Sequence, residues 1–342
     1  MALLTRKTRY ETMVQHESES NRAFFPERPD DMVSGLEEGA FKKHSWTSGE
    51  TKRAGFCRLD SLHEVSFEDV NMWSDHGYAA FGLRIDSRKV PGRLIKSEMD
   101  KVIKAWKLEH DVKSVPHVVR SELRQQIMED LFSRATPVPK MVEIAVDFRR
   151  QRVLISGASK NDLDDVRRML ARHLNMWTTR SCVVDEMKDT WTKASPTTVF
   201  SHIVRKSIED GLNVDIDGIG NLKVVLGTRV QLMDAQGQDI TLVISGESNA
   251  RDCADALDKK MSPVQARFIF AVDGDEMFFH VIAQTDDMNL HEVETPPSGG
   301  ETLMEQITVK MMLLERAETL WRAAIEKAVD QVQDTLLEGA IA

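Results

Sequence analysis

Residues 140–159 of the chain are KMVEIAVDFRRQRVLISGAS. Apolar side chains occupy every second position on both sides of FRRQR, at Val142, Ile144, Val146, Val153 and Ile155. A period of two residues is typical of β-strands that bury one face, so the stretch predicts a β-hairpin. The connection FRRQR would be tight and basic.

The segment that follows, SKNDLDDVRRMLARHL, predicts a helix. Ser159 or Asn161 is a favourable N-cap, acidic residues fill the first turn, and arginines come later, as the helix dipole favours. Strand pairs followed by helices indicate an α+β fold, with antiparallel sheets and long helices packed on them.

Helices are also expected on the N-terminal side of the hairpin. Residues 92–108 repeat apolar side chains at helical spacing, at Leu94, Ile95, Met99, Val102, Ile103 and Trp106. A second stripe comprises Leu123, Ile127, Leu131 and Ala135, and Pro137 and Pro139 end it because proline lacks a donor. Further expected elements are helices near 195–210 and 250–261, a hairpin around DGDE, and, from about 301, one long amphipathic C-terminal helix or two consecutive ones.

Charge is distributed unevenly along this acidic chain of net charge −10. Residues 1–88 have 12 basic and 15 acidic side chains, residues 89–180 have 19 and 12, and residues 181–342 have 14 and 28. We therefore expect an N-terminal α+β region at 1–88, a basic central region at 89–180 and an acidic C-terminal α+β region at 181–342. The basic centre suggests a polyanionic partner, although solvated Lys- and Arg-rich helix faces would give the same pattern.

Several classes of function lack a sequence signal. There is no run of about 18 apolar residues for a membrane span and no apolar leader, so we expect a cytoplasmic protein. Cys57, Cys182 and Cys253 lie far apart, without the spacing of a zinc site or a disulfide framework. Phosphate-binding glycine loops and nucleophile motifs are also absent, so we expect no cofactor, no metal and no catalytic residue.

One short motif supports an alternative function. Glu186 and Lys188 in VVDEMKDTW have the E-x-K spacing with which metal nucleases hold Mg²⁺ and assist an attacking water. The motif is common in charged proteins, and a solvated loop or helix is the simpler explanation. A metal-dependent nuclease therefore stays open as an alternative.

The basic centre fits sequence-nonspecific binding of duplex DNA, which needs cations placed along a surface but no base-reading motif. Aromatic side chains nearby are few, which argues against stacking on single strands. The candidate DNA-binding residues are Lys89, Arg93, Lys96, Lys101, Lys104, Lys107, Arg120, Arg124, Arg134, Lys140, Arg149, Arg150 and Arg152.

An ordered set of segments resembles the recombination-associated protein RdgC family. The set comprises Val90-Pro91, Leu94-Ile95-Lys96, the helix from Leu123 to Ala135, the strand pair from Ile144 to Ile155, Ala158-Ser159 and MLARHL at 169–174. GFCRLD at 55–60 and MMLLERAETL at 311–320 are also similar to segments of the family. The chain has Thr136-Pro137 where the family has an aromatic residue.

The resemblance implies an elongated, curved subunit of several subdomains that pairs into a ring-shaped homodimer around duplex DNA. It further implies a nucleoid-associated protein that limits access of a RecA-type recombinase and has no known catalytic site. A protein-only inhibitor or scaffold of recombination proteins remains a further alternative.

Overall fold

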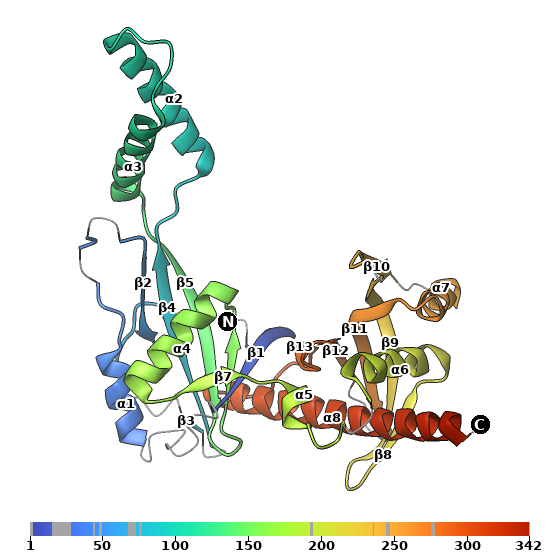
Figure 1. Ribbon diagram of the computed structural model, residues 1–342. Helices are drawn as coiled ribbons and strands as arrows, with labels where there is room; N and C mark the ends of the chain where they lie inside the picture. The colour runs from blue at the N-terminus through green and yellow to red at the C-terminus, as the bar shows by residue number, and fades with distance from the viewer. Residues whose placement is uncertain are drawn as a thin grey trace.

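A computed structural model describes residues 3–15, 29–43, 45–47, 50–67, 73–74, 77–191, 194–234, 236–243, 247–274 and 278–341. The chain forms two lobes, with one long helix running beneath both and a helical arm projecting from the N-terminal lobe (Figure 1). The arm and the C-terminal lobe rise on opposite sides of an open concave region, so the subunit is elongated and curved.

The N-terminal lobe is built on the predicted hairpin. Its strands are β2 (Lys52–Cys57), β3 (Trp73–Ser74), β4 (Tyr78–Ser87), β5 (Val138–Asp147), β6 (Arg152–Ser156) and β7 (Thr178–Arg180). Helices α1 (Pro29–Glu38) and α4 (Lys160–Leu174) lie on one face of this sheet (Figure 1). Val142, Ile144 and Val146 are fully buried against them, which confirms the predicted inward face.

The C-terminal lobe contains the strands β8 (Leu212–Ile216), β9 (Gly220–Met233), β10 (Asp239–Val243), β11 (Ser262–Val272), β12 (Phe278–Gln284) and β13 (Leu290–Glu294). Its shorter helices are α5 (Val183–Glu186), α6 (Pro196–Glu209) and α7 (Glu247–Asp258). The helices expected near 195–210 and 250–261 are therefore confirmed. The DGDE hairpin is present as β11 and β12, but Asp275 and Glu276 of its turn lie outside the described residues.

Strand β1 (Lys7–Gln15) joins the lobes into one sheet. It pairs with β13 through Lys7–Arg9 and with β6 through Tyr10–Val14. The 13-stranded sheet has the order β10-β9-β11-β12-β13-β1-β6-β5-β4-β2, and its strand pairs are antiparallel wherever the structure describes them. This arrangement confirms the α+β class, with helices packed on an antiparallel sheet.

Helix α8 (Leu303–Ile341) runs along both lobes as a single helix (Figure 1). Trp321 on α8 is 1% exposed and packs among Phe200, Phe268 and Phe270 of the C-terminal lobe. Its indole N–H donates to the Met288 carbonyl at 2.7 Å, so the ring is anchored at its polar end too.

A capping box begins α4, and of the two N-cap candidates in the sequence the structure uses Ser159. Ser159 is the N-cap, and its hydroxyl and amide both contact the Asp162 carboxylate, at 2.7 and 2.9 Å. Lys52 and Lys140 approach the same carboxylate, at 3.1 and 2.6 Å. Burial raises the pKa of Asp162, but the contacts with Lys140, Ser159 and Lys52 lower it well below its ordinary value. The start of α4 is therefore tied to β2 and β5.

The arm consists of α2 (Gly92–Glu109) and α3 (His117–Arg134), which confirms both predicted central helices. Met99 is the only buried residue of α2, and α3 has none. The predicted stripe on α3 lies half-buried against α2, but Leu94, expected on the buried face, is 42% exposed. Two helices alone cannot enclose both sides of an apolar stripe.

The division of the chain at residues 88 and 180 stays a prediction.

A lysine is buried where α8 meets β1 and β13. Lys310 is 2% exposed, and its Nζ donates to the Thr5 carbonyl at 3.0 Å and to the Thr295 hydroxyl at 2.6 Å. No carboxylate of the described chain lies within ion-pair distance of it. Burial therefore lowers the pKa of Lys310 from 10.5 to about 8.

Replacing Lys310 with methionine is expected to raise the free energy of unfolding near neutral pH by up to about 3 kcal/mol, since each pKa unit is about 1.4 kcal/mol. Between pH 8 and 10.5 the unfolded chain binds more protons at this position than the folded protein. The wild type therefore gains stability through that window, and the advantage of Lys310→Met shrinks. Urea denaturation of both proteins across the window measures the difference.

The comparison has internal controls. Tyr78 and Cys57, whose pKa values burial raises to about 12, titrate in both proteins and cancel in the difference. Without Lys310, the Thr5 carbonyl still accepts a hydrogen bond from the Thr8 hydroxyl, and the Thr295 hydroxyl still donates to the Pro296 carbonyl. The substitution therefore leaves neither group without a hydrogen-bond partner. A difference that does not vary with pH would contradict the assigned titration.

Candidate nucleic-acid interface

The arm holds most of the predicted DNA-binding residues. It leaves the body after β4 at Pro91 and returns to β5 through Pro137, so two proline-containing connections support it. Helix α2 lies on the side of the arm toward the C-terminal lobe, and α3 lies on the far side (Figure 1). Helix α2 therefore borders the concave region.

One group of predicted cations is free of ion pairs. No carboxylate in the part of the chain that the structure describes lies within 4.0 Å of these side chains, and all are exposed or half-exposed. We call them the arm cations: Lys89, Arg93, Lys96, Lys104, Lys107, Arg120 and Arg124. Unpaired surface cations keep their full charge for phosphate, because no internal acid has to be displaced.

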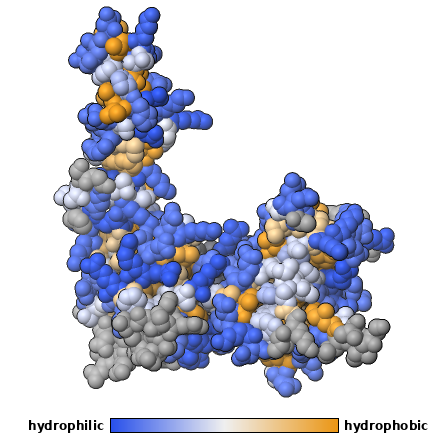
Figure 2. Space-filling view, in the orientation of Figure 1, coloured by the Kyte–Doolittle hydropathy of each residue, from blue (hydrophilic) through white to orange (hydrophobic). Residues whose placement is uncertain are grey.

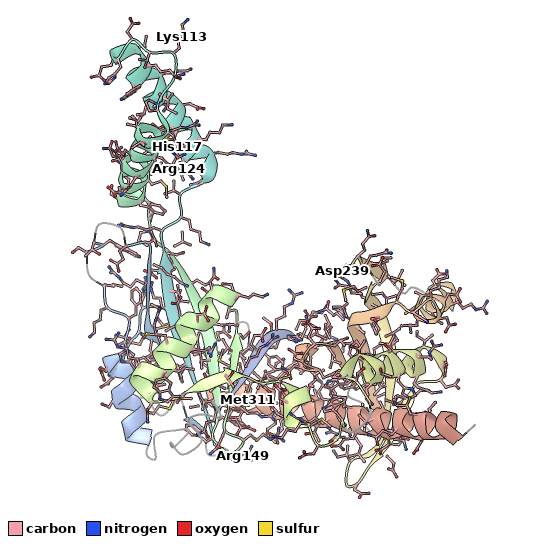
Figure 3. The ribbon with its side chains drawn as sticks, viewed as in Figure 1. Lys113, His117, Arg124, Arg149, Asp239 and Met311 are labelled. Carbon is pink, nitrogen blue, oxygen red and sulfur yellow. The ribbon has the colours of Figure 1, made fainter. Side chains whose placement is uncertain are left out.

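A groove of about 460 Å³ separates α2 from α3. Lys96, His117, Arg120 and Arg124 contribute its basic wall, with Asp100 as the opposing acid and Ile95 and Met99 among its apolar lining. Figure 3 shows His117 and Arg124 along the arm, with Lys113 at its end. His117 and Lys113 were not among the predicted residues, although their place in the break between two basic helices was a signal for them.

The remaining predicted cations are engaged in ion pairs. Lys101 pairs with Glu98 and Arg134 with Asp130, both within the arm, at 2.7 Å. Lys140 pairs with Asp162 on α4 at 2.6 Å. These acids compete with phosphate for the same cations.

The basic hairpin connection FRRQR docks on the acidic helix α8. Arg150 contacts Glu315 at 2.6 Å, and Arg149 donates to the Tyr78 hydroxyl at 2.7 Å. Arg152 contacts Glu318 at 3.1 Å and Glu186 at 2.9 Å. The structure thus places Arg149, Arg150 and Arg152 at the junction of the lobes, away from the arm (Figure 3).

Glu186 ends the short helix α5, so the E-x-K motif does not lie on a strand. Its carboxylate accepts from the Ser181 hydroxyl and pairs with Arg152 and Arg322. Burial alone would raise the pKa of Glu186. The hydrogen bond from Ser181 and the two guanidinium groups have the larger combined effect in the opposite direction, so the pKa lies below its ordinary value. Among the described residues, no group of three or more His, Cys, Asp or Glu side chains could hold a metal ion.

Apolar side chains are exposed on the arm. Leu108 is 83% exposed, Val118 67% and Val112 39%. The arm surface is otherwise mostly hydrophilic, with scattered hydrophobic patches (Figure 2). Trp106 stacks on His110 with ring centroids 4.1 Å apart and shields part of the end of α2. Exposed apolar side chains on a projecting element are candidates for a contact surface.

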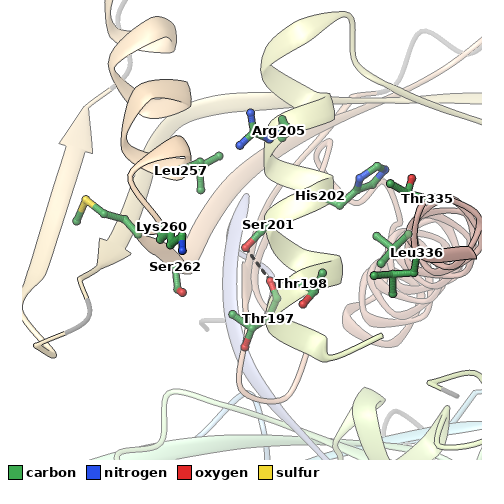
Figure 4. Close-up of a pocket in the computed structure, with 12 residues that line it drawn as sticks. Thr197, Thr198, Ser201, His202, Arg205, Leu257, Lys260, Ser262, Thr335 and Leu336 are labelled. Carbon is green, nitrogen blue, oxygen red and sulfur yellow. Dashed lines mark hydrogen bonds between the residues drawn. The ribbon is translucent and has the colours of Figure 1, made fainter. Parts of the chain in front are cut away.

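A second groove, of about 460 Å³, lies in the C-terminal lobe between α6, the end of α7 and the end of α8. Its lining includes hydroxyl groups and the basic side chains of His202, Arg205 and Lys260 (Figure 4). Arg205 is paired with Asp258 at 2.7 Å and His202 contacts the Gln331 side chain at 2.8 Å, so this groove is less positive than the arm. Ser201 donates to the Thr197 carbonyl at 2.7 Å.

None of the described helices is both long and apolar enough to cross a bilayer.

No curated protein shows a sequence match to the chain. The family described as "Putative exonuclease, RdgC" matches residues 26–215, which is more than half of the 342 residues. The matched range contains the arm, the β4–β6 strands and α4, which are the segments that carry the sequence resemblance. The chain therefore belongs to the RdgC family.

Proposed function

We propose that this chain is a noncatalytic protein that binds duplex DNA without sequence preference and modulates homologous recombination. The observation that carries the proposal is the contrast between the arm cations and the other predicted cations. In the described part of the chain no carboxylate lies within ion-pair distance of the arm cations, and the arm stands beside a concave region, whereas the predicted cations of the body contact acids. A positive wall on an acidic molecule attracts DNA to one side only.

The subunit would act as one half of a homodimeric ring around the duplex. Its curved outline supplies half of an enclosure (Figure 1), and the exposed Leu108 and Val112, at the end of α2 and just after it, supply an apolar contact at the free end of the arm. A closed symmetric dimer buries such a patch on itself. The ring would hold DNA through backbone phosphates, and no base-reading element is required.

Occupied duplex would be a poor substrate for a RecA-type recombinase, because both proteins would need the same stretch of DNA. The effect on recombination would then arise by competition, without a cofactor. A nucleoid-associated location in the cytoplasm follows from the same proposal.

The arm cations generate the first test. The double substitution of Lys96 and Lys104 by glutamine is expected to lower the slope of log K against log salt by up to about 0.9 per lost phosphate contact. Arg149→Gln with Arg150→Gln removes the same charge from the ion-paired set and is expected to change the slope little. Equal effects of the two pairs on binding to random-sequence duplex would contradict the assignment to the arm.

Ring closure is tested by DNA topology. A gel-shift series across salt concentrations should show weaker loading on covalently closed circular duplex than on linear duplex, because a closed ring needs a free end. Leu108→Asp with Val112→Asp should remove this difference by opening the contact at the end of the arm, and light scattering should report whether a second contact still holds the dimer. Equal loading of both DNA forms by the wild type would exclude a preassembled closed ring.

Nuclease activity has a direct test. Linear duplex incubated with Mg²⁺ or Mn²⁺ is expected to stay intact, since the Glu186 carboxylate is held by Arg152 and Arg322. Cleavage that Glu186→Ala abolishes, in a protein that still folds by circular dichroism, would overturn the noncatalytic proposal in favour of a metal-dependent nuclease using Glu186 and Lys188.

A further inference from the structure

The arm meets the body at a cavity of about 590 Å³, which is within the size range of peptide and small-molecule sites. One wall is α3, which contributes Met128 and Phe132, and the other is the segment around Trp46. The cavity lies on the α3 side of the arm, which faces away from the C-terminal lobe (Figure 1). It therefore opens away from the concave region proposed to hold DNA, although Arg124 borders both this cavity and the groove between the arm helices.

Two guanidinium groups border the cavity without a carboxylate partner in the described chain. Arg88 stacks on the Trp46 ring at 4.5 Å, and its buried Nε has no hydrogen-bond partner. Arg124 lies on α3 and reaches both this cavity and the groove between the arm helices. A buried, unsatisfied donor is costly, and a bound acceptor near Arg88 would add to the favourable charge interaction.

The acids of the cavity do not neutralise these arginines. Glu50 accepts two hydrogen bonds from Arg53, at 3.0 and 2.7 Å, and the Arg53 contact chiefly lowers the pKa of Glu50 to about 2. Glu129 accepts from Gln125 at 3.1 Å. The cavity thus offers positive charge beside an apolar floor, with hydroxyl groups at Thr47, Thr51, Ser121 and Ser133 on its lining.

Trp46 holds Arg53 and Arg88 in place. Arg53 lies over its ring at 4.4 Å and Arg88 at 4.5 Å, so both cations are fixed by cation–π contacts. Arg88 is held further by its amide, which donates to the Thr51 carbonyl at 2.9 Å. Preorganised cations lose little freedom when they bind an anion, which favours a specific site over a diffuse basic surface.

We infer that this cavity binds the end of an acidic partner peptide, with its terminal carboxylate on Arg88 and Arg124 and a large apolar side chain against Met128 and Phe132. The lining hydroxyl groups would pair with the peptide backbone. Charge complementarity selects the occupant, because the apolar floor and the two unpaired guanidinium groups match an apolar residue that carries a carboxylate. The site would dock a protein partner independently of DNA.

The test uses the full-length protein and a fluorescein-labelled peptide of several aspartates ending in Leu-Phe with a free carboxylate. Fluorescence anisotropy should show saturable binding that weakens about tenfold or more in Arg88→Gln, since a charge-assisted hydrogen bond is lost. Met128→Gln should also weaken peptide binding, because it removes part of the apolar floor that contacts the terminal side chain of the peptide. A peptide ending in an amide, or in alanine instead of phenylalanine, should bind correspondingly less.

Arg93→Gln is the matched control, because it removes an arm arginine that does not line the cavity. Arg93→Gln should bind the peptide as the wild type does but bind DNA more weakly. Arg88→Gln should bind DNA as the wild type does but bind the peptide more weakly. The two binding measurements therefore test the peptide site and the DNA proposal separately. Equal binding of the amidated peptide, unchanged binding by Arg88→Gln, or displacement of the peptide by duplex DNA would overturn the inference. The last result would assign the cavity to the DNA surface.

Discussion

The attachment of α8 to the N-terminal lobe fixes the shape on which the rest of the molecule depends. Glu315 and Glu318 of α8 hold the arginines of the β5–β6 connection, while Trp321 one turn further is buried in the other lobe. Tyr10 and Tyr78 donate to the same glutamates, at 3.2 and 3.0 Å. Burial leaves Glu318 with a raised pKa despite Arg152, so the cluster needs each of its partners. The direction in which the arm projects follows from this junction.

The same junction explains how an acidic chain presents one basic surface. The arginines of FRRQR neutralise part of the excess acid of α8, and Lys52 and Lys140 neutralise Asp162 at the start of α4. Ion pairs neutralise the predicted cations of the body, whereas the described residues place no carboxylate within ion-pair distance of the arm cations. Local pairing, rather than net charge, decides which surface attracts phosphate.

The local elements were predictable because their causes are local. Alternation at Val142–Val146 identified the strand, an N-cap residue at Ser159 or Asn161 indicated the start of α4, and proline identified the end of α3. The partners of Arg150 and Arg152 were not predictable, since Glu315 and Glu318 lie more than 160 residues away along the chain. The basic connection therefore resembled the arm in sequence, although it packs at a junction. Glu186 posed the same problem, because its arginine partners come from β6 and α8.

The arm also differs from the body in how it is stabilised. The body buries fully enclosed aromatic side chains such as Phe81, Phe268 and Trp321, whereas the arm buries only Met99 among its described residues. Such a unit gains little from hydrophobic burial, and its helices depend on each other and on two proline-bounded connections. Elements with few buried contacts open at the lowest free energy, so contacts outside the subunit add the most to the stability of the arm. The surface with the most unpaired charge is thus also the one most stabilised by a bound partner.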